Sequence, residues 1–192
     1  AVADQTVSVT TTDDDVAGFT IAETEGSTGV DESGSTDIFT IVLDTQPSSD
    51  VVLSITSSDT GEATVESLIQ FTSANWDTAQ NVTVTGADDG IIDGTQTSTI
   101  TVTVVDAITD DDFDAVADQT VSVTTTDDDV AGFTIAETEG STGVDESGST
   151  DIFTVVLNAE PSSNVVLDIT SSDTGEATVT SSLTFTAANW DT

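Results

Sequence analysis

The chain of 192 residues carries 37 Asp and Glu side chains and no Lys, Arg, His or Cys. Without basic side chains it can form no side-chain salt bridge, and it has no electrostatic basis for binding nucleic acid or an anionic membrane. It has no apolar stretch long enough to cross a bilayer. Because Tyr is also missing, most general bases, nucleophiles and transition-metal ligands are lacking, and we expect no enzymatic activity.

Two carboxylates roughly 4 Å apart repel each other by about 4 kcal/mol at an effective dielectric constant near 20. Wherever the fold gathers acidic side chains, protons, hydrogen-bond donors or cations from solution must therefore neutralise them. Cations from solution must therefore be considered wherever the fold brings carboxylates together.

The sequence repeats itself with a period of 114 residues. Residues 1–40 recur unchanged as residues 115–154, and 11 of the 78 positions that can be compared across the period differ. This period is too long for a solenoid and suits a complete β-sandwich of about 100 residues. We predict the last strand of a preceding repeat (1–15), a complete repeat (16–129) and a partial next repeat without its final strands (130–192). We expect the chain to be a segment of a longer protein.

Alternation of apolar and polar residues, typical of half-buried strands, runs through each repeat. In chain order it covers residues 5–12, 37–43, 51–55, 81–85, 97–105 and 119–126. Phe39, Ile41 and Leu43 share one face, and we expect them in the core with Phe19 and Phe71. Runs rich in Gly, Ser and Asp separate these segments, which gives about seven strands per repeat. We predict an all-β fold of tandem immunoglobulin-like β-sandwiches.

The acidic residues concentrate at the ends of the predicted strands. They lie at residues 31–32, 59, 88–93, 110–114 and 127–129. Calcium takes about six to eight oxygen ligands and tolerates irregular geometry, so loops that meet at one end of a sandwich could bind it. The alternative interpretation is a solvated, salt-adapted surface. Since no EF-hand spacing occurs, a calcium site here requires residues that are far apart in the sequence.

Several motifs resemble the Calx-beta family, the calcium-binding sandwich of sodium–calcium exchangers and of long bacterial surface proteins. They are VDESG, SDTGEAT, ADDGIID after NVTVTG, and the terminal VSVTTTDDD, while LTFTAANWDT is similar to the bacterial adhesin branch. The resemblance spans the whole repeat and implies a Calx-beta-type sandwich that binds Ca²⁺. It places calcium ligands of the complete repeat at Glu32, Asp59, Asp88, Asp89, Asp93, Asp127, Asp128 and Asp129.

The resemblance also places matching ligands outside the complete repeat. In the partial repeat they are Glu146 and Asp173, and in the leading segment they are Asp13, Asp14 and Asp15. The family pattern has another acid shortly after position 93, where this chain has the sequence GTQ instead. The number of calcium ions per repeat is therefore left open.

These features predict a calcium-stabilised structural spacer in a long extracellular or cell-surface protein or adhesin. Its partners would be neighbouring repeats of the same chain, with homotypic association as a further option. A second hypothesis is a module that binds polysaccharide or like repeats, with Trp76 and Trp190 stacking on sugar; the alternative for both is a core or rim position. A third hypothesis, a two-carboxylate glycosidase, is disfavoured by an aromatic content of 5%.

Overall fold

The structure, a computed structural model that describes residues 2–192, confirms the all-β class. The strands of the complete repeat are β1 (Phe19–Glu23), β2 (Thr28–Asp31), β3 (Thr36–Leu43), β4 (Val51–Ser57), β5 (Ala63–Val65), β6 (Leu68–Phe71), β7 (Gln80–Gly86), β8 (Gln96–Val104) and β9 (Gln119–Thr126). Those of the partial repeat are β10 (Phe133–Glu137), β11 (Phe153–Leu157), β12 (Val165–Asp168) and β13 (Ser182–Phe185).

In the part of the chain that the structure describes, helical structure is limited to four single turns. These 3-10 turns are η1 (Thr24–Gly26), η2 (Asp106–Ile108), η3 (Asp111–Phe113) and η4 (Thr138–Gly140). Within residues 2–192, no helix has the length and apolar character needed to span a bilayer.

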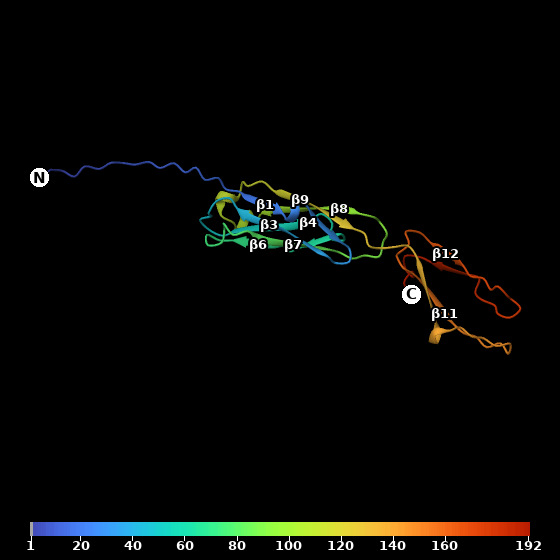
Figure 1. The fold of residues 1–192 in the computed structure, drawn as a ribbon. Helices are drawn as coiled ribbons and strands as arrows, with labels where there is room; N and C mark the ends of the chain where they lie inside the picture. The colour runs from blue at the N-terminus through green and yellow to red at the C-terminus, as the bar shows by residue number, and fades with distance from the viewer. Residues whose placement is uncertain (1) are drawn as a thin grey trace.

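The complete repeat is a sandwich of two sheets (Figure 1). One sheet has the order β1-β3-β7-β5 and the other has the order β2-β9-β8-β4-β6. All neighbouring strands are antiparallel except β2 and β9, which are parallel. The repeat has nine strands instead of the predicted seven or so, because the four-residue β2 and the three-residue β5 are too short to show alternation in the sequence.

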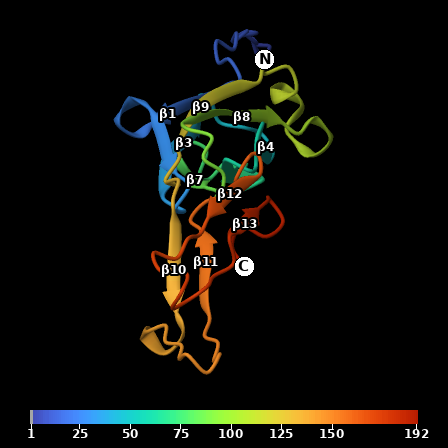
Figure 2. The same cartoon turned by 90° about the vertical axis from the view of Figure 1, so that its right-hand side faces the viewer.

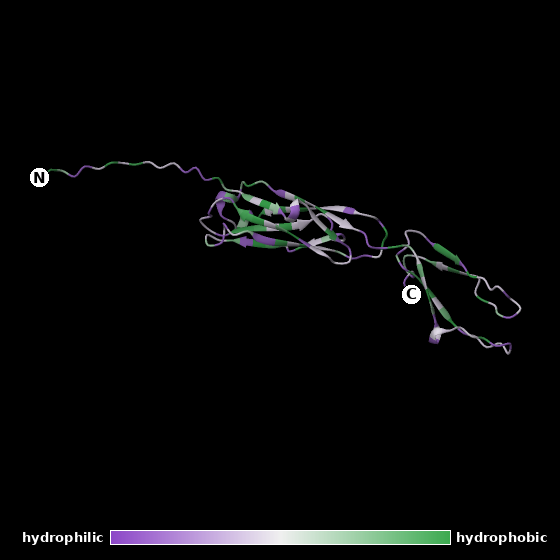
Figure 3. Ribbon diagram, viewed as in Figure 1, coloured by the Kyte–Doolittle hydropathy of each residue, from purple (hydrophilic) through white to green (hydrophobic). Residues whose placement is uncertain are grey.

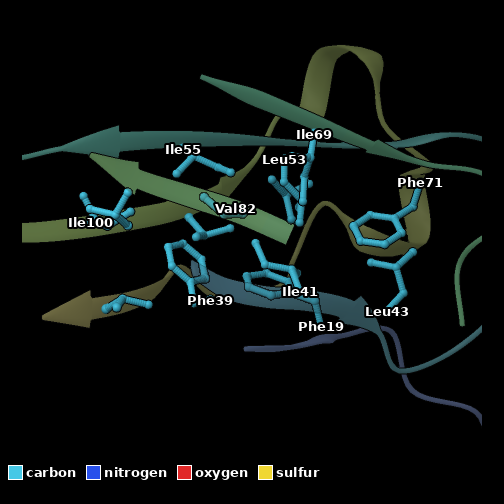
Figure 4. Close-up of a cluster of buried hydrophobic side chains, with 14 of the residues drawn as sticks. Phe19, Phe39, Ile41, Leu43, Leu53, Ile55, Ile69, Phe71, Val82 and Ile100 are labelled. Atoms are coloured by element: carbon cyan, nitrogen blue, oxygen red, sulfur yellow. The ribbon is translucent and has the colours of Figure 1, made fainter. Parts of the chain in front are cut away.

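The core lies between the two sheets and follows the predicted alternation. Phe39 and Ile41 on β3 face Leu53 and Ile55 on β4, with Val82 of β7 between them (Figure 4). Each large apolar side chain buried in this way contributes roughly 1.5–3 kcal/mol. The core positions expected from the sequence are confirmed as buried: Phe19, Phe39, Ile41, Leu43 and Phe71.

The partial repeat begins the same fold again. Phe133 pairs with Leu157 as Phe19 pairs with Leu43, one period earlier. Its two hairpin-like pairs, β10–β11 and β12–β13, are separate two-stranded sheets (Figure 2). No counterparts of β7, β8 and β9 close them, so Phe133 is 53% exposed where Phe19 is 2% exposed. The apolar residues of β11 and β12, seen in Figure 3, are consequently only partly covered.

The leading segment shows the same dependence on partners. Residues 5–12 have the sequence of β9, yet they form no strand and are exposed throughout. In the complete repeat this sequence pairs with β8 on one side and β2 on the other. Strand formation by QTVSVTTT therefore requires neighbouring strands, and the prediction that residues 1–15 belong to a preceding sandwich stays a prediction.

Candidate cation-binding site

One end of the complete sandwich collects carboxylates from four separate segments. Glu32 follows β2, Glu62 lies in the turn before β5, the loop from β7 to β8 carries Asp89 and Asp93, and Asp129 follows β9. Backbone hydrogen bonds hold these segments together. The amide of Glu32 donates to the carbonyl of Thr126 (3.1 Å), and the amide of Ala87 donates to the carbonyl of Glu62 (2.9 Å).

Close packing at Gly86 fixes how β2 approaches β7 below the site. A Cβ atom at Gly86 would lie 1.9 Å from the carbonyl oxygen of Asp31, so no other residue fits there without moving β2. The Gly86 amide also donates to the carbonyl of Ser35 (3.0 Å). This close approach places Glu32 beside the β7–β8 loop.

The gathered side chains form two groups that share Glu32. In one group Glu32, Asp89 and Asp129 bring one carboxylate oxygen each to within 4.8 Å of one another, and in the other Glu32, Glu62 and Asp93 do the same. Five carboxylates therefore meet with no Lys, Arg or His in the chain to balance them. The carboxylate of Glu32 lies at the centre of this arrangement.

Three of these carboxylates have a buried oxygen without a hydrogen-bond partner. They are Oε2 of Glu32, Oε2 of Glu62 and Oδ2 of Asp129. Glu32 is 1% exposed and Glu62 is 8% exposed, so water cannot replace the missing partners easily. A buried ionised carboxylate without a partner is strongly unfavourable, and proteins normally pair it with donors or a metal.

The pKa values of these carboxyl groups reflect this unfavourable burial of charge. Burial, then the charges of Asp127 and Asp89, raise the pKa of Glu32 from 4.5 to about 7. Burial and the charge of Asp93 raise the pKa of Glu62, and burial and the charge of Asp127 raise that of Asp129. Without a bound cation the cluster therefore favours protonation of its buried members.

Asp127 has a different part in the site. Its Oδ2 accepts the amide of Gly94 (2.8 Å) and its Oδ1 accepts the amide of Asp129 (2.8 Å), which holds the pKa of Asp127 below its usual value. It thereby ties the β7–β8 loop to the end of β9. Asp127 orders the two segments that carry Asp93 and Asp129.

The structure brings together four of the eight ligands that the resemblance implied for the complete repeat: Glu32, Asp89, Asp93 and Asp129. The other four lie nearby but outside both groups: Asp59, Asp88, Asp127 and Asp128. Asp59 caps its own turn by accepting the amide of Gly61 (2.9 Å), and its charge acts on Glu62. Asp88 and Asp128 are exposed, and their charges raise the pKa of Asp129.

Glu62 is the site residue that the sequence analysis missed. The motif SDTGEAT drew attention to its Asp, whereas the structure buries its Glu next to Glu32. No local sequence signal marks Glu62, because the three-residue β5 is too short to show alternation and the burial of Glu62 depends on packing against distant segments.

The ligands predicted outside the complete repeat are not gathered into a cluster. Glu146 and Asp173 are exposed, although their counterpart Glu32 is buried and Asp59 adjoins the site. Asp13, Asp14 and Asp15 lie in the exposed leading segment. In neither place does the described chain supply counterparts of both the β7–β8 loop and the other strand ends, so these positions stay predictions.

The acidic residues 110–114 stabilise a loop of the fold. Asp110 is buried and accepts the hydroxyl of Ser48 (2.8 Å), the amide of Ser49 (2.7 Å) and the amide of Asp112 (3.1 Å). These donors lower its pKa to about 2. Unlike Glu32, this carboxylate is satisfied within the chain, and it anchors the loop that carries the buried Phe113.

The donor set of the cluster is oxygen alone, which suits a hard divalent cation. Unpartnered buried oxygens, a shared central carboxylate and surplus negative charge all fit bound Ca²⁺ or Mg²⁺. The fold and this cluster define an acidic all-β sandwich with a candidate site for hard cations at one end.

Comparison with known proteins assigns this chain to no family. No model of a protein family matches the chain, and no curated protein matches it. Among solved structures, the E. coli chaperone DraB is similar over 62% of this chain and 60% of its own, with 10% identity and a TM-score of 0.44.

Two further solved structures are similar to the chain. SSP-19, an MSP-domain protein like family member from Caenorhabditis elegans, is similar over 53% of this chain and 92% of its own, with 18% identity and a TM-score of 0.35. A Bacteroides ovatus GH5 xyloglucanase is similar over 56% of this chain and 18% of its own, with 16% identity and a TM-score of 0.38. These likenesses concern the β fold and not the function.

Proposed function

We propose that the complete repeat is a calcium-stabilised structural unit of a linear array, a spacer within a long extracellular or cell-surface protein. The observation that carries this proposal is the pair of buried, unpartnered carboxylates of Glu32 and Glu62 at the centre of an all-acidic cluster. In a chain without a single basic side chain, only protons or external cations can neutralise them.

Two adjacent cations bridged by Glu32 account for the two groups together. One ion would take oxygens from Glu32, Asp89 and Asp129, and the other from Glu32, Glu62 and Asp93. Two divalent ions supply four positive charges against five carboxylates, which removes most of the repulsion. Calcium fits better than magnesium, because the ligands come from separate loops and magnesium requires near-ideal octahedral geometry.

A structural role also fits the cluster better than a catalytic one. Glu32 is 1% exposed, so a glycosidic oxygen could not reach the carboxylate with the most strongly perturbed pKa. Trp76 is partly buried against the core, a rim position that does not favour the sugar-stacking hypothesis. We therefore propose neither an enzyme nor a lectin. Residues 16–129 carry a closed core, and the short connection from Thr126 at the end of β9 to Phe133 at the start of β10 supports a linear arrangement.

The test is thermal unfolding of the 192-residue chain in chelator, in millimolar calcium, in magnesium and in sodium chloride of matched ionic strength. A cation that binds only the folded state stabilises it by about 2.7 kcal/mol per site at 100 times its Kd. We expect calcium to raise the Tm clearly and magnesium much less. Equal stabilisation by sodium chloride would show that screening alone acts, and the site would be rejected.

A further inference from the structure

The loop between β7 and β8 has a second feature that the cation site does not use. Between Asp89 and Asp93 it carries Gly90, Ile91 and Ile92, and the two isoleucines remain 39% and 47% exposed with the partial repeat beside them. Figure 1 shows this loop at the end of the sandwich, reaching the partial repeat.

The loop tip makes defined contacts with the next repeat. The amide of Glu160 donates to the carbonyl of Gly90, and Ile91 forms a parallel β-bridge with Glu160. A Cβ atom at Gly90 would lie 3.0 and 3.1 Å from two ring carbons of Trp190, so the absence of a side chain lets the loop seat against the indole. The contact combines backbone pairing at Glu160 with packing of Gly90 against the ring of Trp190.

Ile91 and Ile92 also line an apolar hollow of the partial repeat with Phe133, Leu157 and Val165. In the complete repeat the counterparts of these three residues are buried in one cluster with Phe113. A closed repeat therefore fills this hollow itself. The part of the contact that a closed repeat can share is the rim, formed by Glu160 and Trp190.

The complete repeat presents the same rim at its opposite end, at Gln46 and Trp76. The backbone carbonyl of Trp76 accepts the amide of Leu43 (3.1 Å) as that of Trp190 accepts the amide of Leu157 (2.8 Å), so the chain is held alike at the two tryptophans. The hollow beside this rim is acidic: Asp13, Asp15, Asp110 and Asp112 line it together with Val16, Gln46 and Pro47. The complete repeat thus carries the docking loop at one end and, at the other end, the positions that correspond to Glu160 and Trp190.

We propose that residues 90–92 of one repeat dock on the rim of the following repeat, at positions 160 and 190 here, and that this head-to-tail contact orders the array. A loop and a seat on different surfaces form a heterologous contact, which propagates in a line instead of closing into a dimer. The inference deepens the proposed spacer function: cations bound by Asp89 and Asp93 would fix the residues on both sides of the docking tip.

The test uses the two tryptophans of the chain as separate reporters. Trp76→Phe leaves Trp190 as the sole indole, and Trp190→Phe leaves Trp76. Acrylamide quenching of Trp190 is measured in the 192-residue chain with and without Gly90→Val, which forces a side chain against the indole. Ile91→Ser is the second variant, and Ile108→Ser, at an exposed residue of η2, is the matched control.

We expect Gly90→Val and Ile91→Ser each to raise the quenching constant of Trp190 at least two-fold, while Trp76 quenching and the Ile108→Ser chain stay unchanged. Trp190 quenching that is indifferent to both variants would overturn the docking, even if calcium raises the Tm and the cation site stands. Conversely, a two-fold effect of both variants in a chain that calcium does not stabilise would support docking and reject the proposed cation role.

Discussion

Glu32 provides the sharpest test, because neutralising it must have opposite effects with and without calcium. In the folded chain its pKa is about 7, against 4.5 for an ordinary Glu side chain. One pKa unit corresponds to 1.36 kcal/mol, so the ionised carboxylate destabilises the cation-free fold by about 3 kcal/mol without screening. Solvent at the rim of the site screens part of this, and we expect Glu32→Gln to stabilise the chain in chelator by about 1–2 kcal/mol.

With calcium the same substitution replaces one carboxylate oxygen of the residue that both groups share. If the affinity at each of two sites falls ten-fold, the stabilisation by calcium falls by about 1.4 kcal/mol per site. For a domain of this size about 1 kcal/mol shifts the Tm by about 4 °C. Glu32→Gln should therefore raise the Tm in chelator at pH 8 by about 4–8 °C and reduce the calcium-induced increase by about 10 °C.

Asp44→Asn is the matched control, because it also removes one negative charge. Asp44 accepts the hydroxyl of Thr20 (2.8 Å), and the next repeat makes the same bond with Asn158 and Thr134 (2.9 Å). Calorimetric melting of both variants with and without calcium is the measurement. If Glu32→Gln were less stable than the parent chain in chelator, the carboxylate would be satisfied inside the protein, and the argument for a cation would fail.

Three further predictions follow from the same structure. Asp89→Asn should weaken calcium binding in a titration by ten-fold or more, whereas Asp128→Asn, outside both groups, should change it less than three-fold; equal effects would contradict the ligand assignment. Asp110→Asn should cost about 2 kcal/mol in urea unfolding through its lost hydrogen bonds and leave calcium affinity unchanged. In chelator, stability should fall as pH rises from about 4.5 through 7, because Glu32 has its higher pKa in the folded state; a flat profile would contradict this.

The sequence was sufficient for the fold class and the main strands. Alternation placed Phe39, Ile41 and Leu43 on one buried face, because a strand with a covered face must be apolar at every second residue. It gave no sign of β2 or β5, whose three or four residues are too few for a period to appear. The parallel pairing of β2 with β9 joins residues 90 or more apart, and no local pattern encodes it.

The sequence predicted where the candidate site lies but not which residues form it. Acidic motifs at strand ends located the end of the sandwich where carboxylates gather, and Glu32, Asp89, Asp93 and Asp129 were among the residues expected there. What separates these from Asp59 or Asp128 is whether a carboxylate oxygen comes within 4.8 Å of those of the other members, which depends on packing between distant segments. Glu62 was missed for the same reason.

Identical sequences in this chain differ in burial, which shows that the candidate site depends on the closed sandwich. Glu32 and Glu146 both lie in VDESG, yet Glu32 is buried and Glu146 is exposed. The difference arises because β7, β8 and β9 close the first sandwich and bring Asp89, Asp93 and Asp129 to Glu32. A cation held by these side chains would bind only the closed repeat, so binding free energy would act as folding free energy. The same closure positions the loop tip at Gly90, because the β7–β8 loop carries both the carboxylates and the docking residues. In an array of such repeats, cation binding and head-to-tail order would therefore depend on the same loop.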